Sequence, residues 1–320
     1  MTLLLLALGL VLLVAGGEFL VRGAVELAQK FRISPLLIGL TLVGFGTSTP
    51  ELVTSLQAAF AGSPGIAVGN VVGSNLANIL LILGVAAVIN PVTIARETFK
   101  RDGIVLAIAT LMCVAAVLVG RLTPWIGALF VLSLASYILF AFWQERRSNA
   151  VADAASGAPV SDAPKPTAAR ILVDLVFVVG GLLLTILGAR LLVSSAIEIA
   201  TQFHVSQTVI GLTIVAVGTS LPELVTSIMA ALRKHGDIAF GNIVGSNIYN
   251  VFGILGVTAM VKPIDVPPEI ANFDVWVMLA ATVVLFAAAL SRWKITRLEG
   301  GAMLAGYTAY VGWLGLNAGV

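Results

Sequence analysis

Long apolar stretches separated by short polar segments recur along the whole chain. Ten of them approach or exceed the ~20 residues needed to cross a bilayer. They cover roughly residues 3–27, 35–61, 66–90, 103–120, 122–143, 171–199, 206–232, 238–261, 274–291 and 300–319. Because lipid offers the backbone no hydrogen-bond partners, segments of this length must be helical. The pattern predicts an all-α polytopic membrane protein with ten transmembrane helices.

A polar segment divides these stretches into two groups of five. Residues 144–170 are rich in Ala, Ser and Pro and have no apolar periodicity, which is typical of flexible linkers. We therefore expect a first membrane unit at residues 1–143, a linker at 144–170 and a second membrane unit at 171–320. The N-terminal stretch lacks the basic region of a signal peptide, so we interpret it as the first span.

The composition agrees with a membrane location. Charged residues make up 11% of the chain and hydrophobic residues 59%, whereas soluble domains carry about 25% charged residues. Too little polar surface is therefore available to cover a soluble particle. A net charge of +2 without a basic cluster gives no reason to expect nucleic acid as a partner. The single cysteine, Cys113, excludes an internal disulfide.

The basic residues predict the orientation. If the spans alternate, fourteen of the 18 Lys and Arg residues fall on one side and two, Arg121 and Lys262, on the other, while Arg22 and Arg190 lie within spans. Short cytoplasmic loops carry the excess of Lys and Arg. We therefore expect a multi-pass protein of the cell membrane with both termini outside and residues 144–170 in the cytoplasm.

The two halves repeat each other at a constant offset of 172 residues. Residues 34–55 match 206–227 at 15 of 22 positions, and residues 69–84 match 241–256 at 10 of 16. Because five spans are an odd number, the second copy must cross the membrane in the opposite direction. Two inverted five-helix repeats are typical of secondary transporters, whose binding sites lie near the midplane between broken helices.

Each repeat contains a proline followed by a glutamate inside an apolar stretch, Pro50-Glu51 in GTSTPE and Pro222-Glu223 in GTSLPE. A proline opens the preceding helical turn and frees a carbonyl oxygen, and the helix dipole stabilises a carboxylate at the start of the next half-helix. Helical spacing places four hydroxyls near the glutamates, those of Thr47, Ser48, Thr219 and Ser220. Such oxygen ligands suit Ca²⁺ and Na⁺.

A second polar motif follows in each repeat. Its Asn and Ser residues are spaced four apart, so each set forms a polar stripe on one helix face. The sets are Asn70, Ser74 and Asn78, and Asn242, Ser246 and Asn250. Ser and Thr in membrane helices also bond their own backbone, and the accompanying GxxxG spacing also marks close packing, so packing stays open for these residues. A membrane-embedded carboxylate is functional by default, because its insertion costs ~2.5 to 3.5 kcal/mol.

Other charged residues within the stretches favour structural roles. Glu18 and Arg22 lie one turn apart, where they can form an ion pair, and Arg190 occupies the repeat position of Glu18, which also allows an ion pair between the halves. His204 and His235 lie at span ends and are interpreted as loop residues.

The doubled motif GTSxPELVTS followed by GNxVGSNxxN resembles the α-repeats of the sodium/calcium exchanger branch of the cation/calcium antiporter superfamily, prokaryotic type. The resemblance covers all ten spans. It implies that ions are bound by the two glutamates, neighbouring Thr and Ser residues, a carbonyl one turn earlier, and Ser and Asn of the next helix. The implied ligands are Glu51, Thr47, Ser48, the Gly44 carbonyl, Ser74 and Asn78, together with Glu223, Thr219, Ser220, the Ala216 carbonyl, Ser246 and Asn250.

The expected function is exchange of Na⁺ for Ca²⁺ by alternating access, in which the resemblance implies that spans 1 and 6 slide against spans 2, 3, 7 and 8. The partners are these two ions and membrane lipid; no cofactor is expected, and the oligomeric state is open, with a functional monomer consistent with the pattern. The absence of GxSxG, HExxH and paired-Asp motifs disfavours an enzyme.

Two other transport functions stay open. Buried glutamates can also carry protons, so H⁺/Ca²⁺ antiport is the alternative, although relatives of that branch have Asn in the run before the glutamate. A Ca²⁺ channel would need an open pore, which proline-broken helix pairs do not favour. Some relatives, including potassium-dependent exchangers, carry Asp at the position of Asn250, so we expect no K⁺ requirement.

Overall fold

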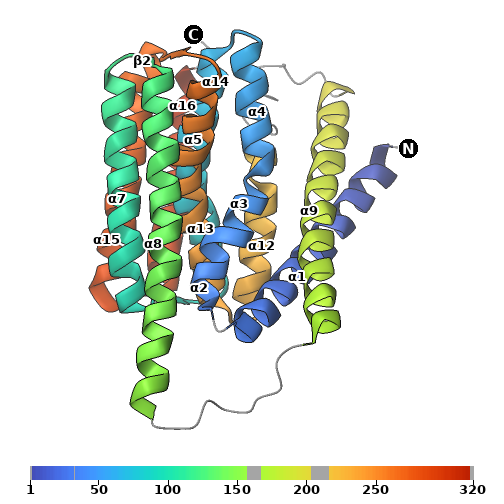
Figure 1. The fold of residues 1–320 in the computed structure, drawn as a ribbon. Coiled ribbons are helices and arrows are strands. Elements are labelled where there is room, and N and C mark those ends of the chain that lie inside the picture. Colours follow the sequence, from blue (N-terminus) through green and yellow to red (C-terminus); the bar gives the residue numbers. More distant parts are fainter. Residues whose placement is uncertain (1, 32, 157–166, 203–215, 318–320) are drawn as a thin grey trace.

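The computed structural model describes residues 2–31, 33–156, 167–202 and 216–317, which are helical almost throughout (Figure 1). This confirms the all-α expectation; segments labelled η are π-helices. The first half contains α1 (Thr2–Phe31), α2 (Pro35–Ile38), η1 (Gly39–Val43), α3 (Gly44–Thr47), α4 (Thr49–Phe60), α5 (Pro64–Leu76), η2 (Ala77–Ile82), α6 (Leu83–Ile89), α7 (Arg96–Leu118) and α8 (Pro124–Ser156). The second half contains α9 (Ala168–Gln202), α11 (Ala216–Thr219), α12 (Leu221–Leu232), α13 (Gly236–Tyr249), η4 (Asn250–Leu255), α14 (Gly256–Val261), η5 (Ile270–Asp274), α15 (Val275–Arg292) and α16 (Arg297–Asn317).

Among the described residues, seven helices are long and apolar enough to cross a membrane. They are Thr2–Phe31, Pro64–Ile89, Phe99–Leu118, Pro124–Arg147, Ala169–Ala196, Gly236–Val261 and Ile270–Arg292. Each coincides with one of the ten expected stretches. Of the other three, 35–61 is broken into short helices, 206–232 lies partly outside the described residues, and the described part of 300–319 falls in α16. The count of ten therefore stays a prediction.

Helices α1 and α9 lie side by side and cross at the edge of the molecule, apart from the main bundle that contains α5, α7, α8 and α13 to α16 (Figure 1). The broken segments α2 to α4 and α12 lie between this pair and the bundle. The pair contacts the rest of the protein mainly through α12 and α2. The arrangement separates a two-helix unit from a larger core.

Glycines let the backbones of α1 and α9 come into contact. A Cβ added at Gly16 would lie 2.8 Å from the Gly181 carbonyl oxygen, and one at Gly181 would lie 2.8 Å from the Gly16 oxygen. Gly9 and Gly188 form a second such pair, with Cβ distances of 2.9 and 2.7 Å to each other's carbonyl oxygens. Small residues are the usual means by which membrane helices approach closely.

Contacts between the halves occur in reciprocal pairs, which the 172-residue offset relates to within one residue. The offset carries Gly9 to Gly181 and Gly16 to Gly188, so the two glycine contacts are equivalent. Strand β1 (Val92–Thr93) pairs with β4 (Lys294–Ile295), and β2 (Arg121–Leu122) pairs with β3 (Ile264–Asp265), both antiparallel. The equivalent residues Thr110 and Thr282 meet each other, with Oγ1 atoms 3.4 Å apart. Such reciprocity is what a two-fold axis between two copies produces.

The structure changes the boundary of the expected linker. Helix α8 continues to Ser156, so residues 144–156 are helical rather than flexible. These residues lack apolar periodicity, but Gln, Glu, Arg and Ala are good helix formers that extend the helix beyond its apolar part. The Glu145 carboxylate also accepts a 2.6 Å hydrogen bond from the Ser34 N–H just before α2. The division of the chain into two membrane units stays a prediction.

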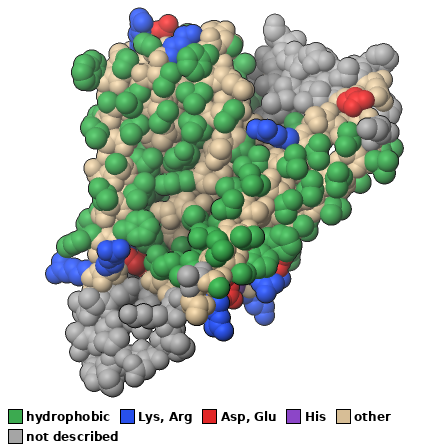
Figure 2. Space-filling view, turned by 45° about the vertical axis from the view of Figure 1, so that its right-hand side comes forward, with side chains coloured by type: hydrophobic (Ala, Val, Ile, Leu, Met, Phe, Trp, Pro, Cys, Tyr) green, Lys and Arg blue, Asp and Glu red, His purple; other side chains and the backbone are tan. Residues whose placement is uncertain are grey.

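Hydrophobic side chains cover the middle of the molecular surface, and most Lys and Arg side chains lie towards its two ends (Figure 2). Large apolar side chains are exposed on the long helices α8 and α9, for example Leu129 at 54%, Leu139 at 71% and Leu183 at 62%. An apolar belt between polar ends is the distribution expected for a protein surrounded by lipid. The chain is therefore a multi-pass membrane protein.

Candidate cation site

The two proline-glutamate motifs break their helices in the same way. Ser48 separates α3 from α4 with φ −82° and ψ 8°, and Ser220 separates α11 from α12 with φ −91° and ψ 9°. A proline in the first turn cannot continue the preceding helix, because it lacks the N–H. Each break therefore begins a new helix with its glutamate in the first turn, where the positive end of the dipole favours a carboxylate.

Both glutamates are buried, with Glu51 and Glu223 each 1% exposed, and each is bound from the opposite half. The Ser48 hydroxyl donates to Glu223 Oε1 at 2.8 Å, and the Ser220 hydroxyl donates to Glu51 Oε1 at 3.2 Å. We expected each serine beside the glutamate of its own motif. In the structure each serine hydroxyl bonds the glutamate of the opposite motif, and the backbone at both serines departs from helical angles.

The second polar motifs contribute from α5 with η2 and from α13 with η4. Ser220 Oγ lies 3.4 Å from Ser74 Oγ, and Ser246 Oγ donates to the Gly44 carbonyl oxygen at 3.2 Å. The Asn250 amide donates to Asn75 Oδ1 at 3.0 Å, and the Asn78 amide donates to Asn247 Oδ1 at 3.2 Å. The expected Ser and Asn residues of both halves thus meet across the interface.

Asn75 and Asn247 were not among the expected site residues. They follow Ser74 and Ser246 directly in the GSN triplet of each repeat. The expected polar stripe takes every fourth residue and therefore does not include them. They lie three residues before Asn78 and Asn250, the spacing at which helix residues are neighbours on one face. The repeated triplet is the sequence signal by which both residues could have been found.

Two of the remaining implied ligands, Thr47 and the Gly44 carbonyl, contact residues of the second motif in the other half. Thr47 Oγ1 lies 3.0 Å from the Val43 carbonyl oxygen and 3.2 Å from Asn242 Oδ1. The Gly44 carbonyl oxygen accepts two hydrogen bonds, one from the Ser246 hydroxyl and one from the Ser48 N–H, each at 3.2 Å. Thr219 is half-buried beside a cavity, and Ala216 begins α11 three residues before it.

Asn70 and Asn242 support the helices that carry the glutamates. The Asn70 amide donates to the Glu51 carbonyl oxygen at 3.0 Å and to Ser55 Oγ at 2.9 Å. The Asn242 amide makes the equivalent contacts in the second half, 3.4 Å to the Glu223 carbonyl oxygen and 2.9 Å to Ser227 Oγ. These two amides therefore fix the positions of the carboxylates.

Four buried oxygens at the centre have no hydrogen-bond partner among the described residues. They are Glu51 Oε2, Glu223 Oε2, Asn78 Oδ1 and Asn250 Oδ1, two pairs related by the repeat. A buried acceptor without a partner costs about 1 to 3 kcal/mol, and more if it is charged. Among the described residues there is no group of three or more His, Cys, Asp or Glu side chains that could hold a metal ion. Two carboxylates with neutral oxygens form a donor set for a hard cation such as Na⁺ or Ca²⁺.

A cavity of about 520 Å³ lies beside the first helix break and is lined by residues of α4, α9 and α11. Pro50, Thr54, Gly218 and Thr219 line it together with Arg190. It therefore adjoins both proline motifs.

The other membrane-embedded charges differ from the expected pairing. Glu18 does not pair with Arg22; its carboxylate accepts from Arg233, with Nε 2.9 Å from Oε2, because α12 packs against this part of α1. Arg22 lies over the Phe177 ring, 5.1 Å from its centroid. His235 precedes α13 as a loop residue, as predicted, and His204 lies outside the described residues.

A family model described as "Sodium/calcium exchanger protein" matches residues 1–143 and 173–316. The chain belongs to the sodium/calcium exchanger family. The prediction of the prokaryotic branch of the cation/calcium antiporter superfamily is thereby confirmed. Members of this family are transporters, not catalytic enzymes.

Individual relatives match almost the whole exchanger chain. "Putative antiporter CaxA" of Alkalimonas amylolytica is 38% identical over 94% of this chain and 95% of its own. "Sodium/calcium exchanger MaX1" of Methanosarcina acetivorans is 34% identical over 96% and 97%. A solved structure of the sodium-calcium exchanger NCX_Mj, soaked with Na⁺ and Sr²⁺, matches with a TM-score of 0.84 at 30% identity, covering 97% of each chain.

Proposed function

We propose that this exchanger moves Na⁺ and Ca²⁺ in opposite directions across the membrane, with the ions bound between the two broken helices. The observation that carries the proposal is the set of four unpartnered oxygens on Glu51, Glu223, Asn78 and Asn250. A cation would supply the contacts that these buried acceptors lack. The implied ligands Ser48, Ser220, Ser74 and Ser246 lie in the same hydrogen-bonded cluster.

The charge of the site gives a reason for exchange. Two carboxylates neutralise one Ca²⁺, or share several Na⁺ with the neutral oxygens. An empty site would leave two like charges in a low-dielectric interior, which is unfavourable. The empty protein therefore seldom changes its accessible side, and one ion leaves only when another replaces it.

The proposed architecture has ten spans in two inverted repeats, with both termini outside and residues 144–170 on the cytoplasmic side. The reciprocal contacts and the distribution of basic residues support it. In this proposal α1 and α9 slide as spans 1 and 6 against the core, opening the site to each side in turn. Their glycine contacts with each other favour movement as a pair.

The relatives' names support the choice of ions. MaX1 is named a sodium/calcium exchanger, and NCX_Mj structures are described with Na⁺, Ca²⁺ and Sr²⁺ soaks. CaxA is named only as a putative antiporter. The coupling ion therefore needs a direct test.

The test is uptake of radioactive calcium into proteoliposomes under an outward Na⁺ gradient, an outward H⁺ gradient or no gradient. We expect uptake only with the Na⁺ gradient. Uptake driven by H⁺ alone would favour proton/calcium antiport, and passive uptake would favour a channel.

Glu51→Gln and Glu223→Gln should each abolish uptake, because either change removes half of the charge that binds Ca²⁺. Glu269→Gln is the matched control, since Glu269 is exposed before η5. All three variants should elute as the wild type does in size-exclusion chromatography. Full uptake by either glutamine variant would contradict the assignment of the site.

A further inference from the structure

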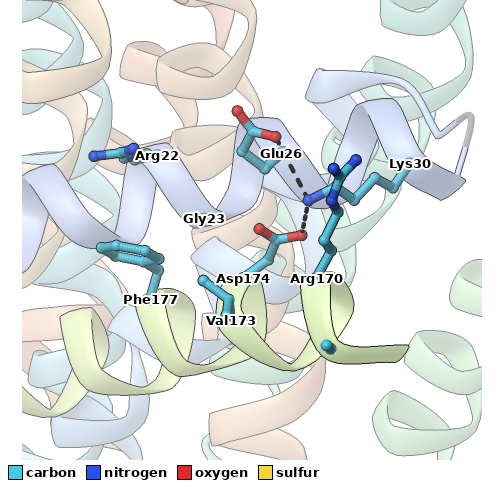
Figure 3. A pocket seen from close by; sticks show the side chains of 9 residues that line it. Arg22, Gly23, Glu26, Lys30, Arg170, Val173, Asp174 and Phe177 are labelled. Carbon is cyan, nitrogen blue, oxygen red and sulfur yellow. Dashed lines mark hydrogen bonds and ion pairs between the residues drawn. The ribbon is translucent and has the colours of Figure 1, made fainter. Parts of the chain in front are cut away.

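A basic pocket lies between α1 and α9, close to where α1 ends and α9 begins. Its volume is about 340 Å³, and its charged lining residues are Arg22, Glu26, Lys30, Arg170 and Asp174 (Figure 3). Three cationic and two acidic side chains leave one net positive charge. The pocket lies far along the chain from the proline motifs and takes no part in the cation site.

Both carboxylates of the pocket form ion pairs with the same lysine. Lys30 Nζ lies 2.5 Å from Asp174 Oδ2 and 3.6 Å from Glu26 Oε2. Arg22 and Arg170 lie at opposite ends of this group in Figure 3. Both arginines are exposed, and no carboxylate among the described residues pairs with either of them. The positive charge that remains is therefore carried by arginine.

An apolar groove begins where this pocket ends. It has a volume of about 400 Å³ and lies between α1 and the outer face of α9, lined by Phe19, Leu172, Val173, Val176, Phe177, Gly180 and Leu184. Val173 and Phe177 line both the pocket and the groove. Arg22 lies over the Phe177 ring at this junction, 5.1 Å from its centroid. The basic pocket is thus continuous with the apolar groove, which runs along the membrane-facing side of α9.

We propose that one anionic glycerophospholipid binds here, with its phosphate against Arg22 and an acyl chain along the groove to Leu184. Arginine near the end of a membrane helix reaches the level of the lipid phosphates, and basic pockets between helices bind anionic headgroups. The net charge of the pocket complements a headgroup with one negative charge. A free phosphate would use the pocket and leave the groove without an occupant, so the continuous groove favours a lipid.

The lipid would contact both helices of the α1–α9 pair. Arg22 and Phe19 come from α1, and the remaining groove residues come from α9. Binding therefore stabilises the pair as one unit. This inference is independent of which cations the protein exchanges, because its residues are separate from the cation site.

The test is titration of detergent-purified protein with phosphatidylglycerol, with bound lipid counted by native mass spectrometry. Arg22→Gln and Arg170→Gln should each weaken binding about fivefold, and the double variant about 25-fold, from the usual contribution of one basic residue near a membrane surface. Arg146→Gln with Arg147→Gln is the matched control, because both residues are exposed on α8. Equal weakening by this control, or unchanged binding by the Arg22/Arg170 variant, would overturn the proposal.

Gly180→Leu tests the groove separately from the charge. A Cβ at Gly180 meets no atom within 4 Å, so the leucine fills the groove without disturbing the fold. We expect at least a fivefold loss of binding for long-chain phosphatidylglycerol. Inorganic phosphate should not displace the lipid at equal concentration, and phosphatidylcholine should bind more weakly than phosphatidylglycerol. Displacement by phosphate would instead indicate a site for a free anion. Equal binding of phosphatidylcholine would show that the headgroup charge does not contribute to binding. Either result would overturn the proposal.

Discussion

The hydroxyls of Ser48 and Ser220 connect the two halves at the residue scale. Each donates to the glutamate of the other half, at 2.8 Å and 3.2 Å. The proposed cation site therefore needs residues of both halves. A hydroxyl that binds a buried carboxylate contributes more than a neutral hydrogen bond does.

Ser48→Ala and Ser220→Ala should each raise the KM for Ca²⁺ about tenfold or more, because a hydrogen bond to a charged group contributes ~1.5 to 3 kcal/mol. The reciprocal geometry predicts effects of similar size. Calcium uptake into proteoliposomes measures both, with Ser133→Ala on the exposed face of α8 as the control. A large effect from one serine and none from the other would contradict the reciprocal arrangement.

With asparagine at position 250, the proposed cation site has two carboxylates, those of Glu51 and Glu223. The Asn250 amide donates to Asn75 Oδ1 at 3.0 Å and its own Oδ1 has no partner among the described residues. We expect calcium uptake to be the same in K⁺ and in choline, because the site lacks the third carboxylate that potassium-dependent exchangers carry here. Uptake that required K⁺ would show this expectation to be wrong.

The sequence predicted which residues belong to the candidate site, but it did not predict which hydrogen-bond partners they have. The repeated motifs predicted the two glutamates and the four central Ser and Asn residues as ligands by chemistry and position, and that role stays a prediction. They did not reveal that each serine bonds the opposite glutamate, because that depends on the non-helical backbone at the break. Glu18 likewise pairs with Arg233 rather than with Arg22 one turn away, since packing of α12 on α1 decides between two available cations.

At the scale of elements, the close contact of α1 and α9 depends on glycine. A Cβ at Gly16 would lie 2.5 Å from Thr185 Oγ1 and 2.6 Å from the Thr185 nitrogen, and the backbone cannot move aside. Gly16→Ala should therefore destabilise the protein by ~1 to 3 kcal/mol, as overpacking does. The measurement is the midpoint of thermal unfolding in detergent.

Gly180→Ala is the control for this change, because its Cβ meets nothing within 4 Å. The two variants add the same methyl group to the same pair of helices. An equal unfolding midpoint for both would contradict the close backbone contact.

Apolar length predicted the positions of most long helices, but it did not predict where α8 ends or where π-turns occur. Helix α8 ends at Ser156, beyond its apolar part, because helix-forming polar residues continue it. The π-helices η2 and η4 leave the hydrophobic pattern almost unchanged, since most residues within them are apolar.

At the scale of the whole molecule, the reciprocal contacts predict that equivalent residues lie on opposite sides of the membrane. Ser63 precedes α5 and its equivalent His235 precedes α13, with similar backbone angles of φ −110°, ψ 71° and φ −94°, ψ 59°. In a Cys113→Ser background, Ser63→Cys should react with an impermeant thiol reagent added outside intact cells. His235→Cys should react only after the cells are opened. Labelling of both from the same side would contradict the inverted repeat.

The central claim is that a cation binds between the glutamates of the two halves. The most direct measurement is anomalous X-ray scattering from crystals of this protein soaked in Sr²⁺, a heavier substitute for Ca²⁺. We predict one strong peak in contact with Glu51 Oε2 and Glu223 Oε2, absent from crystals of the Glu51→Gln variant. A peak elsewhere, no peak in the wild type, or an unchanged peak in the variant would contradict the account.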